Sequence, residues 1–106
     1  MITATMTKHA IHDRAERLAF IAEYVGVGTI QYKFPSEQSE YAEYCITSTG
    51  VLIVRNIDSN SIITAYCPNM NKAVAIFRKN GWTDVPYSLK EKIDRNYKVA
   101  KKMGFI

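Results

Sequence analysis

The chain has 106 residues, of which 47% are hydrophobic and 23% are charged, the balance of an ordinary globular domain. Five glycines and three prolines are too few for a collagen-like or disordered chain, and no apolar run approaches the roughly 18 residues that a membrane span needs. We therefore predict a single domain, residues 1–106, with no membrane partner. The first nine residues lack a basic start followed by an apolar core, so we expect no secretory signal and a cytoplasmic protein.

The net charge is +4, from 14 basic and 10 acidic side chains. This mild positive charge favours encounter with phosphates but does not by itself identify a nucleic-acid-binding protein. The basic side chains are dense between Lys90 and Lys102. Two interpretations stay open: a solvated helix face, or a patch in which Lys98 and Lys101 bind phosphate.

The two cysteines, Cys45 and Cys67, form neither a CxxC pair nor, with the histidines, a zinc-type spacing. We expect reduced thiols, partly buried in strands, and we expect neither a metal nor a cofactor.

The first long segment, Thr7 to Val25, is predicted to be a helix that begins at Thr7 as N-cap and ends at Gly26 or Gly28. The prediction depends on the 4-3-4-3 spacing of one apolar stripe, formed by Ile11, Ala15, Leu18, Ala22 and Val25.

Four strands are expected next, at residues 29–34, 41–47, 51–56 and 61–66. Residues 35–40 form a polar loop, and two short turns, at 48–50 and 58–60, join the last three strands into an antiparallel meander. The strand at 51–56 should be the most buried, because its apolar run is continuous.

The remaining chain is predicted to contain two helices. Residues 71–80 suit a short helix ended by Gly81, with a further strand as the alternative. Ser88 is the predicted N-cap of the last helix, because Glu91 follows at the capping-box spacing. The predicted fold is therefore α+β: an N-terminal helix packed on a four-stranded antiparallel meander, followed by one or more C-terminal helices. The apolar stripe of the last helix is formed by Leu89, Ile93, Tyr97 and Ala100.

The N-terminal helix also carries candidate functional side chains. At about 100° per residue, His9, His12 and Arg17 lie largely off the apolar stripe, and Arg14 lies nearer to it. Imidazole moves protons near neutral pH, and guanidinium binds phosphate while keeping its charge. This combination suits acid–base work on a phosphodiester. The alternative is an exposed helix that happens to carry two histidines.

Thr64 and Tyr66 lie on one side of the last strand, where their hydroxyls would bind phosphate or orient a ribose. The alternative, which the sequence favours equally, is two ordinary β-forming residues on a sheet surface. The sequence has no P-loop, GxGxxG, HExxH, two-metal carboxylate cluster or Ser/Cys nucleophile signature. Metal-dependent nucleases, nucleotide hydrolases and proteases are therefore disfavoured, and an enzyme would work through His, Arg and hydroxyl groups.

Two short segments carry a resemblance to a known group. Residues 7–11 (TKHAI), followed by 16–18 (ERL), resemble the opening of small phage and mobile-element proteins, and residues 62–66 (IITAY) resemble their strand motif. Those proteins belong to the barnase/EndoU/colicin/RelE-like ribonuclease (toxin) fold group, in which an N-terminal helix packs on a four-stranded antiparallel sheet. The resemblance implies metal-independent RNA cleavage, often by a toxin that has an antitoxin partner.

The resemblance also assigns individual residues. The histidine of the group corresponds to His9, its second arginine to Arg17, and its Thr/Ser and the following aromatic residue to Thr64 and Tyr66. The group has a further arginine four residues after the histidine. This chain has Asp13 at that position and Arg14 one residue later.

Two functions follow from these observations. In the first, the protein is a metal-independent endoribonuclease: His9, sharing the task with His12, moves protons, and Arg17 and Arg14 stabilise the phosphate. Thr64 and Tyr66 position the phosphate, and RNA is the partner. In the second, favoured by the small size, by Asp13 and by the basic C-terminal helix, the protein is a non-catalytic, phage-encoded binding protein or inhibitor that docks on a host protein or nucleic acid.

Overall fold

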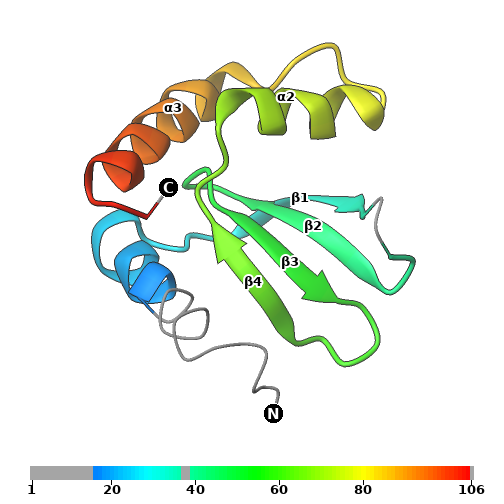
Figure 1. Cartoon of the computed structure of the whole chain (residues 1–106). Coiled ribbons are helices and arrows are strands. Elements are labelled where there is room, and N and C mark those ends of the chain that lie inside the picture. The colour runs from blue at the N-terminus through cyan, green and yellow to red at the C-terminus, as the bar shows by residue number, and fades with distance from the viewer. Residues whose placement is uncertain (1–15, 37–38, 106) are drawn as a thin grey trace.

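The computed structural model describes residues 16–36 and 39–105, which form a helix, four strands and two further helices (Figure 1). Residues 16–20 are helical and continue into a short π-helix, η1 (Ile21–Val25). The strands are β1 (Ile30–Pro35), β2 (Ala42–Thr47), β3 (Leu52–Asn56) and β4 (Ile62–Tyr66), and the last helices are α2 (Met70–Lys79) and α3 (Tyr87–Lys102). The predicted α+β fold is confirmed. Within the described residues, no helix is both long and apolar enough to cross a membrane.

The four strands form one antiparallel sheet in the order β1-β2-β3-β4, so the predicted meander is confirmed. The turn between β2 and β3 is held by the buried Thr47, whose Oγ1 accepts from the backbone N–H of Val51 at 3.2 Å. Gly50 completes this turn at a φ of +85°, a conformation that residues with a Cβ rarely adopt. The turn also lies against α3, since a Cβ on Gly50 would be 3.1 Å from Cγ1 of Ile93.

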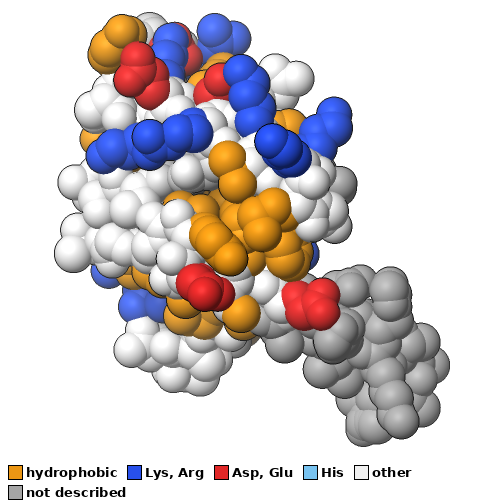
Figure 2. Space-filling view, turned by 90° about the vertical axis from the view of Figure 1, so that its left-hand side faces the viewer, with side chains coloured by type: hydrophobic (Ala, Val, Ile, Leu, Met, Phe, Trp, Pro, Cys, Tyr) orange, Lys and Arg blue, Asp and Glu red, His pale blue; other side chains and the backbone are white. Residues whose placement is uncertain are grey.

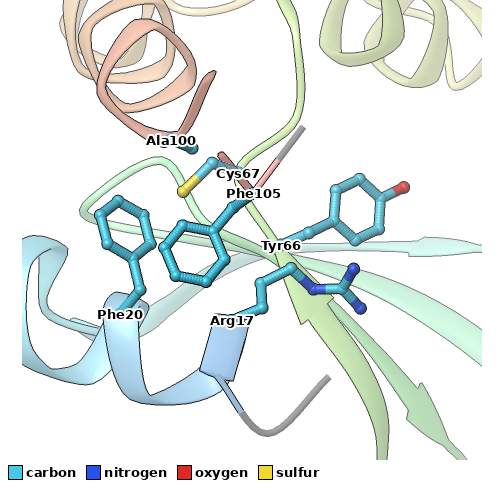
Figure 3. Close-up of a pocket in the computed structure, with 6 residues that line it drawn as sticks. All are labelled: Arg17, Phe20, Tyr66, Cys67, Ala100 and Phe105. Atoms are coloured by element: carbon cyan, nitrogen blue, oxygen red, sulfur yellow. The ribbon is translucent and has the colours of Figure 1, made fainter. Parts of the chain in front are cut away.

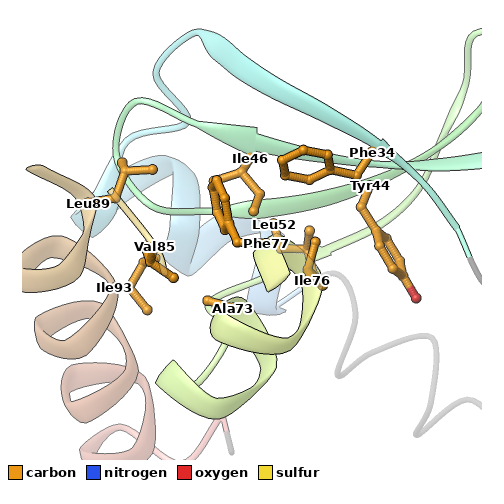
Figure 4. Packing of buried hydrophobic residues seen from close by; sticks show 10 residues of the cluster. All are labelled: Phe34, Tyr44, Ile46, Leu52, Ala73, Ile76, Phe77, Val85, Leu89 and Ile93. Atoms are coloured by element: carbon orange, nitrogen blue, oxygen red, sulfur yellow. The ribbon is translucent and has the colours of Figure 1, made fainter. Parts of the chain in front are cut away.

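Side chains of each strand alternate between the two faces of the sheet, and a hydrophobic cluster lies on each face. The first cluster lies between the sheet and α2 and α3, and the second lies on the opposite face, beneath the N-terminal helix (Figures 1 and 4). The first cluster comprises Phe34, Tyr44, Ile46, Leu52, Ala73, Ile76, Phe77, Val85, Leu89 and Ile93. The second comprises Phe20, Ile21, Cys45, Val51, Ile53, Ala65, Cys67 and Ala100.

The most buried strand is β2, so the expectation for residues 51–56 is wrong. Only Glu43 of β2 is not fully buried, whereas the second half of β3 is half-buried. β2 and β3 are both interior strands, so their positions in the sheet do not explain the difference in burial. The reason is that β3 ends in Arg55 and Asn56, which lead into the exposed hairpin to β4.

The N-terminal helix buries a different side from the predicted stripe. Leu18 is 39% exposed and Ala22 is exposed, whereas Phe20 and Ile21 are only 3% and 1% exposed. The helix turns its two large consecutive side chains toward the second cluster, and its last turn widens so that Gly26 N donates to Ile21 O at 2.7 Å. The end at Gly26 is confirmed, at a φ of +80°. The predicted first part, residues 7–15, lies outside the described residues.

The C-terminal helices are confirmed, with one correction. In α2, the Oδ1 of Asn69 accepts from Lys72 N at 2.7 Å and caps the helix, so the alternative strand is wrong. In α3 the N-cap is Pro86, not Ser88, because the fixed φ of proline already suits helix entry and its carbonyl accepts from Leu89 N at 2.9 Å.

The stripe of α3 is confirmed in part. Leu89, Ile93 and Ala100 are buried and Tyr97 is half-buried, while Asn96 is a buried residue that the stripe did not include. The Nδ2 of Asn96 donates to Thr49 O at 2.7 Å and so ties α3 to the β2–β3 turn.

Candidate functional site

Arg17 lies against β4, which is an edge strand of the sheet. Its Nε donates to Ala65 O at 3.0 Å, and its Nη2 donates to Thr64 Oγ1 at 2.8 Å. Edge strands carry backbone groups that no neighbouring strand pairs, so a charged side chain here also protects the edge. These bonds use only part of the N–H donors of a guanidinium. The same group can therefore hold the strand and still donate to an anion.

Tyr66 completes this cluster, because its ring centroid lies 6.0 Å from Cζ of Arg17 (Figure 3). A guanidinium at this distance from an aromatic ring is within the range of a cation–π interaction. Burial raises the pKa of the Tyr66 hydroxyl, Tyr44 raises it further, and the charge of Arg17 opposes the rise. The hydroxyl is therefore protonated at neutral pH and acts as a hydrogen-bond donor, not as a base.

The structure brings Arg17, Thr64 and Tyr66 together at one edge of the sheet, and their catalytic roles stay predictions. Arg17 is half-buried rather than on an open helix surface, because the helix is rotated toward Phe20 and Ile21. The other N-terminal candidates, His9, His12 and Arg14, lie outside the described residues.

A cavity of about 150 Å³ adjoins the cluster. The rings of Phe20 and Phe105 are stacked on one another, with centroids 4.9 Å apart and an interplanar angle of 22°. The lining residues, drawn in Figure 3, are Arg17, Phe20, Tyr66, Cys67, Ala100 and Phe105. The cavity is therefore mostly apolar, with Arg17 at its border and the guanidinium directed toward Tyr66 (Figure 3).

Phe105 reaches the cavity because the chain reverses after α3. Gly104, at a φ of +87°, donates from its N–H to Lys101 O at 3.2 Å, and Phe105 N donates to Ala100 O at 2.9 Å. This is the hydrogen-bond pattern of a Schellman C-cap, in which the residue after the left-handed glycine packs back on the helix. Helical periodicity does not predict this pocket, although a Gly-Phe pair directly after a helical stripe is typical of such a C-cap.

Both cysteines are free and buried. Cys45 lies within β2 as predicted, whereas Cys67 follows directly after the end of β4 and is not in a strand. Burial raises the pKa of the Cys67 thiol to about 11. The pKa of Cys45 is also raised, first by burial and then by Glu43. A thiol is a nucleophile only as its thiolate, so neither cysteine is activated at neutral pH.

The basic residues of α3 are separate from the Arg17 cluster. Lys98 pairs with Asp94 at 2.8 Å and lies about 160° around the helix from Ala100, at about 100° per residue. Lys101 is exposed in the last turn, next in sequence to Ala100. Figure 2 shows hydrophobic side chains gathered on this side of the molecule, with Lys and Arg on one side of them and acidic residues on the other. Phosphate binding by Lys98 and Lys101 stays a prediction.

Within residues 16–36 and 39–105, no three His, Cys, Asp or Glu side chains are grouped so that they could hold a metal ion. Compared with known proteins, the chain matches no family model, no curated protein and no solved structure.

Proposed function

We propose that the protein is a metal-independent endoribonuclease that cleaves RNA through attack by the ribose 2′-OH. The observation that carries this proposal is the placement of the Arg17 guanidinium between Thr64 Oγ1 and the ring of Tyr66. A positive charge fixed by a strand edge and an aromatic ring is preorganised, so it stabilises a developing negative charge without reorganisation during the reaction. That is the requirement of a phosphodiester transition state.

In the proposed step, the 2′-oxygen attacks the adjacent phosphorus while its proton passes to a base. The P–O5′ bond breaks, the 5′-oxygen receives a proton, and the other product ends in a 2′,3′-cyclic phosphate. His9 and His12 are the proposed proton carriers, since imidazole titrates near neutral pH. Arg17 would bind the non-bridging oxygens, with the Tyr66 hydroxyl as a second donor because it stays protonated.

The test is digestion of labelled RNA by the purified protein in EDTA, with the cyclic phosphate end identified. We expect Arg17→Lys to lower kcat by about 10²–10³, the effect of removing one transition-state donor. Arg78→Lys is the matched control, because Nε of Arg78 also donates to a backbone carbonyl, that of Thr83, at 3.0 Å. Tyr66→Phe keeps the ring beneath the guanidinium and removes only the hydroxyl.

His9→Ala tests the proton-transfer role, with an expected loss of about 10²–10⁴ in rate. Thermal unfolding of each variant separates a lost chemical role from a lost fold. RNA left intact by the folded wild-type protein would reject the proposal, as would full activity in both His9→Ala and Arg17→Lys.

A second function, a non-catalytic phage-encoded binding protein, is favoured by one observation: the cavity beside Arg17 is lined mostly by apolar side chains. Such a surface suits binding as well as chemistry. This function predicts a stoichiometric complex with a host protein or nucleic acid and no turnover. Uncut RNA that nevertheless forms a one-to-one complex with the protein would support it.

A further inference from the structure

The cavity and the Arg17 cluster form one continuous site, because Arg17 and Tyr66 belong to both. A ligand group in the cavity would therefore be adjacent to Arg17, whose guanidinium can hold an anion next to it. The cavity volume of about 150 Å³ matches the size of apolar cavities that hold a single benzene-sized ring, and it is smaller than pockets for drug-sized ligands. It is suited to one six-membered ring.

The walls are suited to a flat aromatic group. Phe105 is half-buried and presents part of its ring to the cavity, and the buried Phe20 is stacked against that ring. Aromatic side chains in such positions stack on nucleic-acid bases with little regard to hydrogen-bonding pattern. Discrimination between bases in this cavity would therefore depend on the size of the ring system of the base.

The charge around the cavity favours a nucleotide over an aromatic side chain of a protein. Arg17, the one charged residue of the lining, lies at its border. Figure 2 shows basic side chains on one side of the hydrophobic patch and acidic side chains on the other. A base attached to a phosphate satisfies both the apolar cavity and the guanidinium, whereas a phenylalanine side chain satisfies only the cavity.

We propose that this cavity is a subsite for one pyrimidine base of the RNA, next to the phosphate that Arg17 binds. The inference rests on the proposed ribonuclease function and adds a specificity: cleavage beside uridine and cytidine in preference to adenosine and guanosine. Binding of the base in the cavity orients the nucleotide, so that its phosphate is held in a defined position at the guanidinium.

The experiment is an NMR titration of the wild-type protein with mononucleotides that it cannot cleave. Uridine 3′-monophosphate should bind about tenfold more tightly than adenosine 3′-monophosphate, and more tightly than uridine or inorganic phosphate alone. Binding of the uridine nucleotide should shift the NMR signals of the Phe20 and Phe105 rings. N-acetylphenylalanine amide is the probe for a protein side chain, and it should bind more weakly than the uridine nucleotide.

Two variants test the cavity in opposite directions. Ala100→Leu fills it and should abolish the pyrimidine preference, with Ala75→Leu, the same change at an exposed position of α2, as its control. Phe105→Ala enlarges the cavity and should admit the purine nucleotide as well as the pyrimidine. Because this variant removes rather than adds volume, it tests the inference even where Ala100→Leu does not fold.

The outcomes separate this inference from the proposed function. Equal binding of uridine and adenosine nucleotides by the wild type overturns the subsite, and so does tighter binding of the phenylalanine amide. RNA cleavage without any base preference overturns the subsite but leaves the ribonuclease. Pyrimidine-selective binding without RNA cleavage overturns the ribonuclease and leaves the cavity as a nucleotide-binding site.

Discussion

Gly50→Ala is expected to be strongly destabilising, because it combines two separate costs. A residue with a Cβ at a φ of +85° costs about 1–2 kcal/mol relative to an ordinary conformation. The added Cβ would also lie 3.1 Å from Ile93 Cγ1 and 3.2 Å from Ile93 N. The backbone of α3 cannot yield as a flexible side chain would, so overpacking adds about 1–3 kcal/mol.

The matched control is Gly81→Ala. Gly81 has a similar φ, +94°, but a Cβ there meets nothing within 4 Å, so only the conformational cost of about 1–2 kcal/mol applies. The two variants and the wild type are compared by urea unfolding followed with far-UV circular dichroism. We expect Gly50→Ala to lose about 2–5 kcal/mol of unfolding free energy. Equal losses in the two variants would refute the close approach of α3 to the β2–β3 turn.

Two further predictions concern buried side chains of the sheet. With its pKa raised to about 11 from 9.0, the Cys67 thiol should react with an aromatic disulfide at pH 8 about 100-fold more slowly than an unfolded-state thiol. Because the pKa is higher in the folded protein, the protonated Cys67 thiol contributes fully to the free energy of unfolding below about pH 9, and this contribution is lost as the pH rises toward 11. Cys67→Ala should therefore flatten the dependence of the unfolding free energy on pH between about 9 and 11. Thr47→Val keeps the shape but removes the Oγ1 that accepts from Val51 N, so it should cost about 1–3 kcal/mol in the same urea assay, and a neutral result would contradict the buried bond.

The sequence determined the elements of this protein, because each depends on local chemistry. Alternating β-formers, separated by short turns, predicted the meander, and the apolar stripe of Leu89 and Ile93 predicted the last helix. Side chains two apart on a strand share a face, so Thr64 and Tyr66 could be placed together before any tertiary structure was known. For the end of the first helix the sequence offered Gly26 or Gly28, and the structure has Gly26.

Tertiary structure decided which surfaces those elements bury. The spacing of Leu18 and Val25 indicates one helix face, but the sheet offers more contact to Phe20 and Ile21, so the helix is rotated and Arg17 meets the edge of β4. The cavity also depends on tertiary structure. Phe20 and Phe105 are far apart in the chain, and they meet only because the N-terminal helix and the turn after α3 pack on the same side of the sheet. Periodicity records which residues can share a face, whereas burial depends on the partner surface, which is contributed by distant residues.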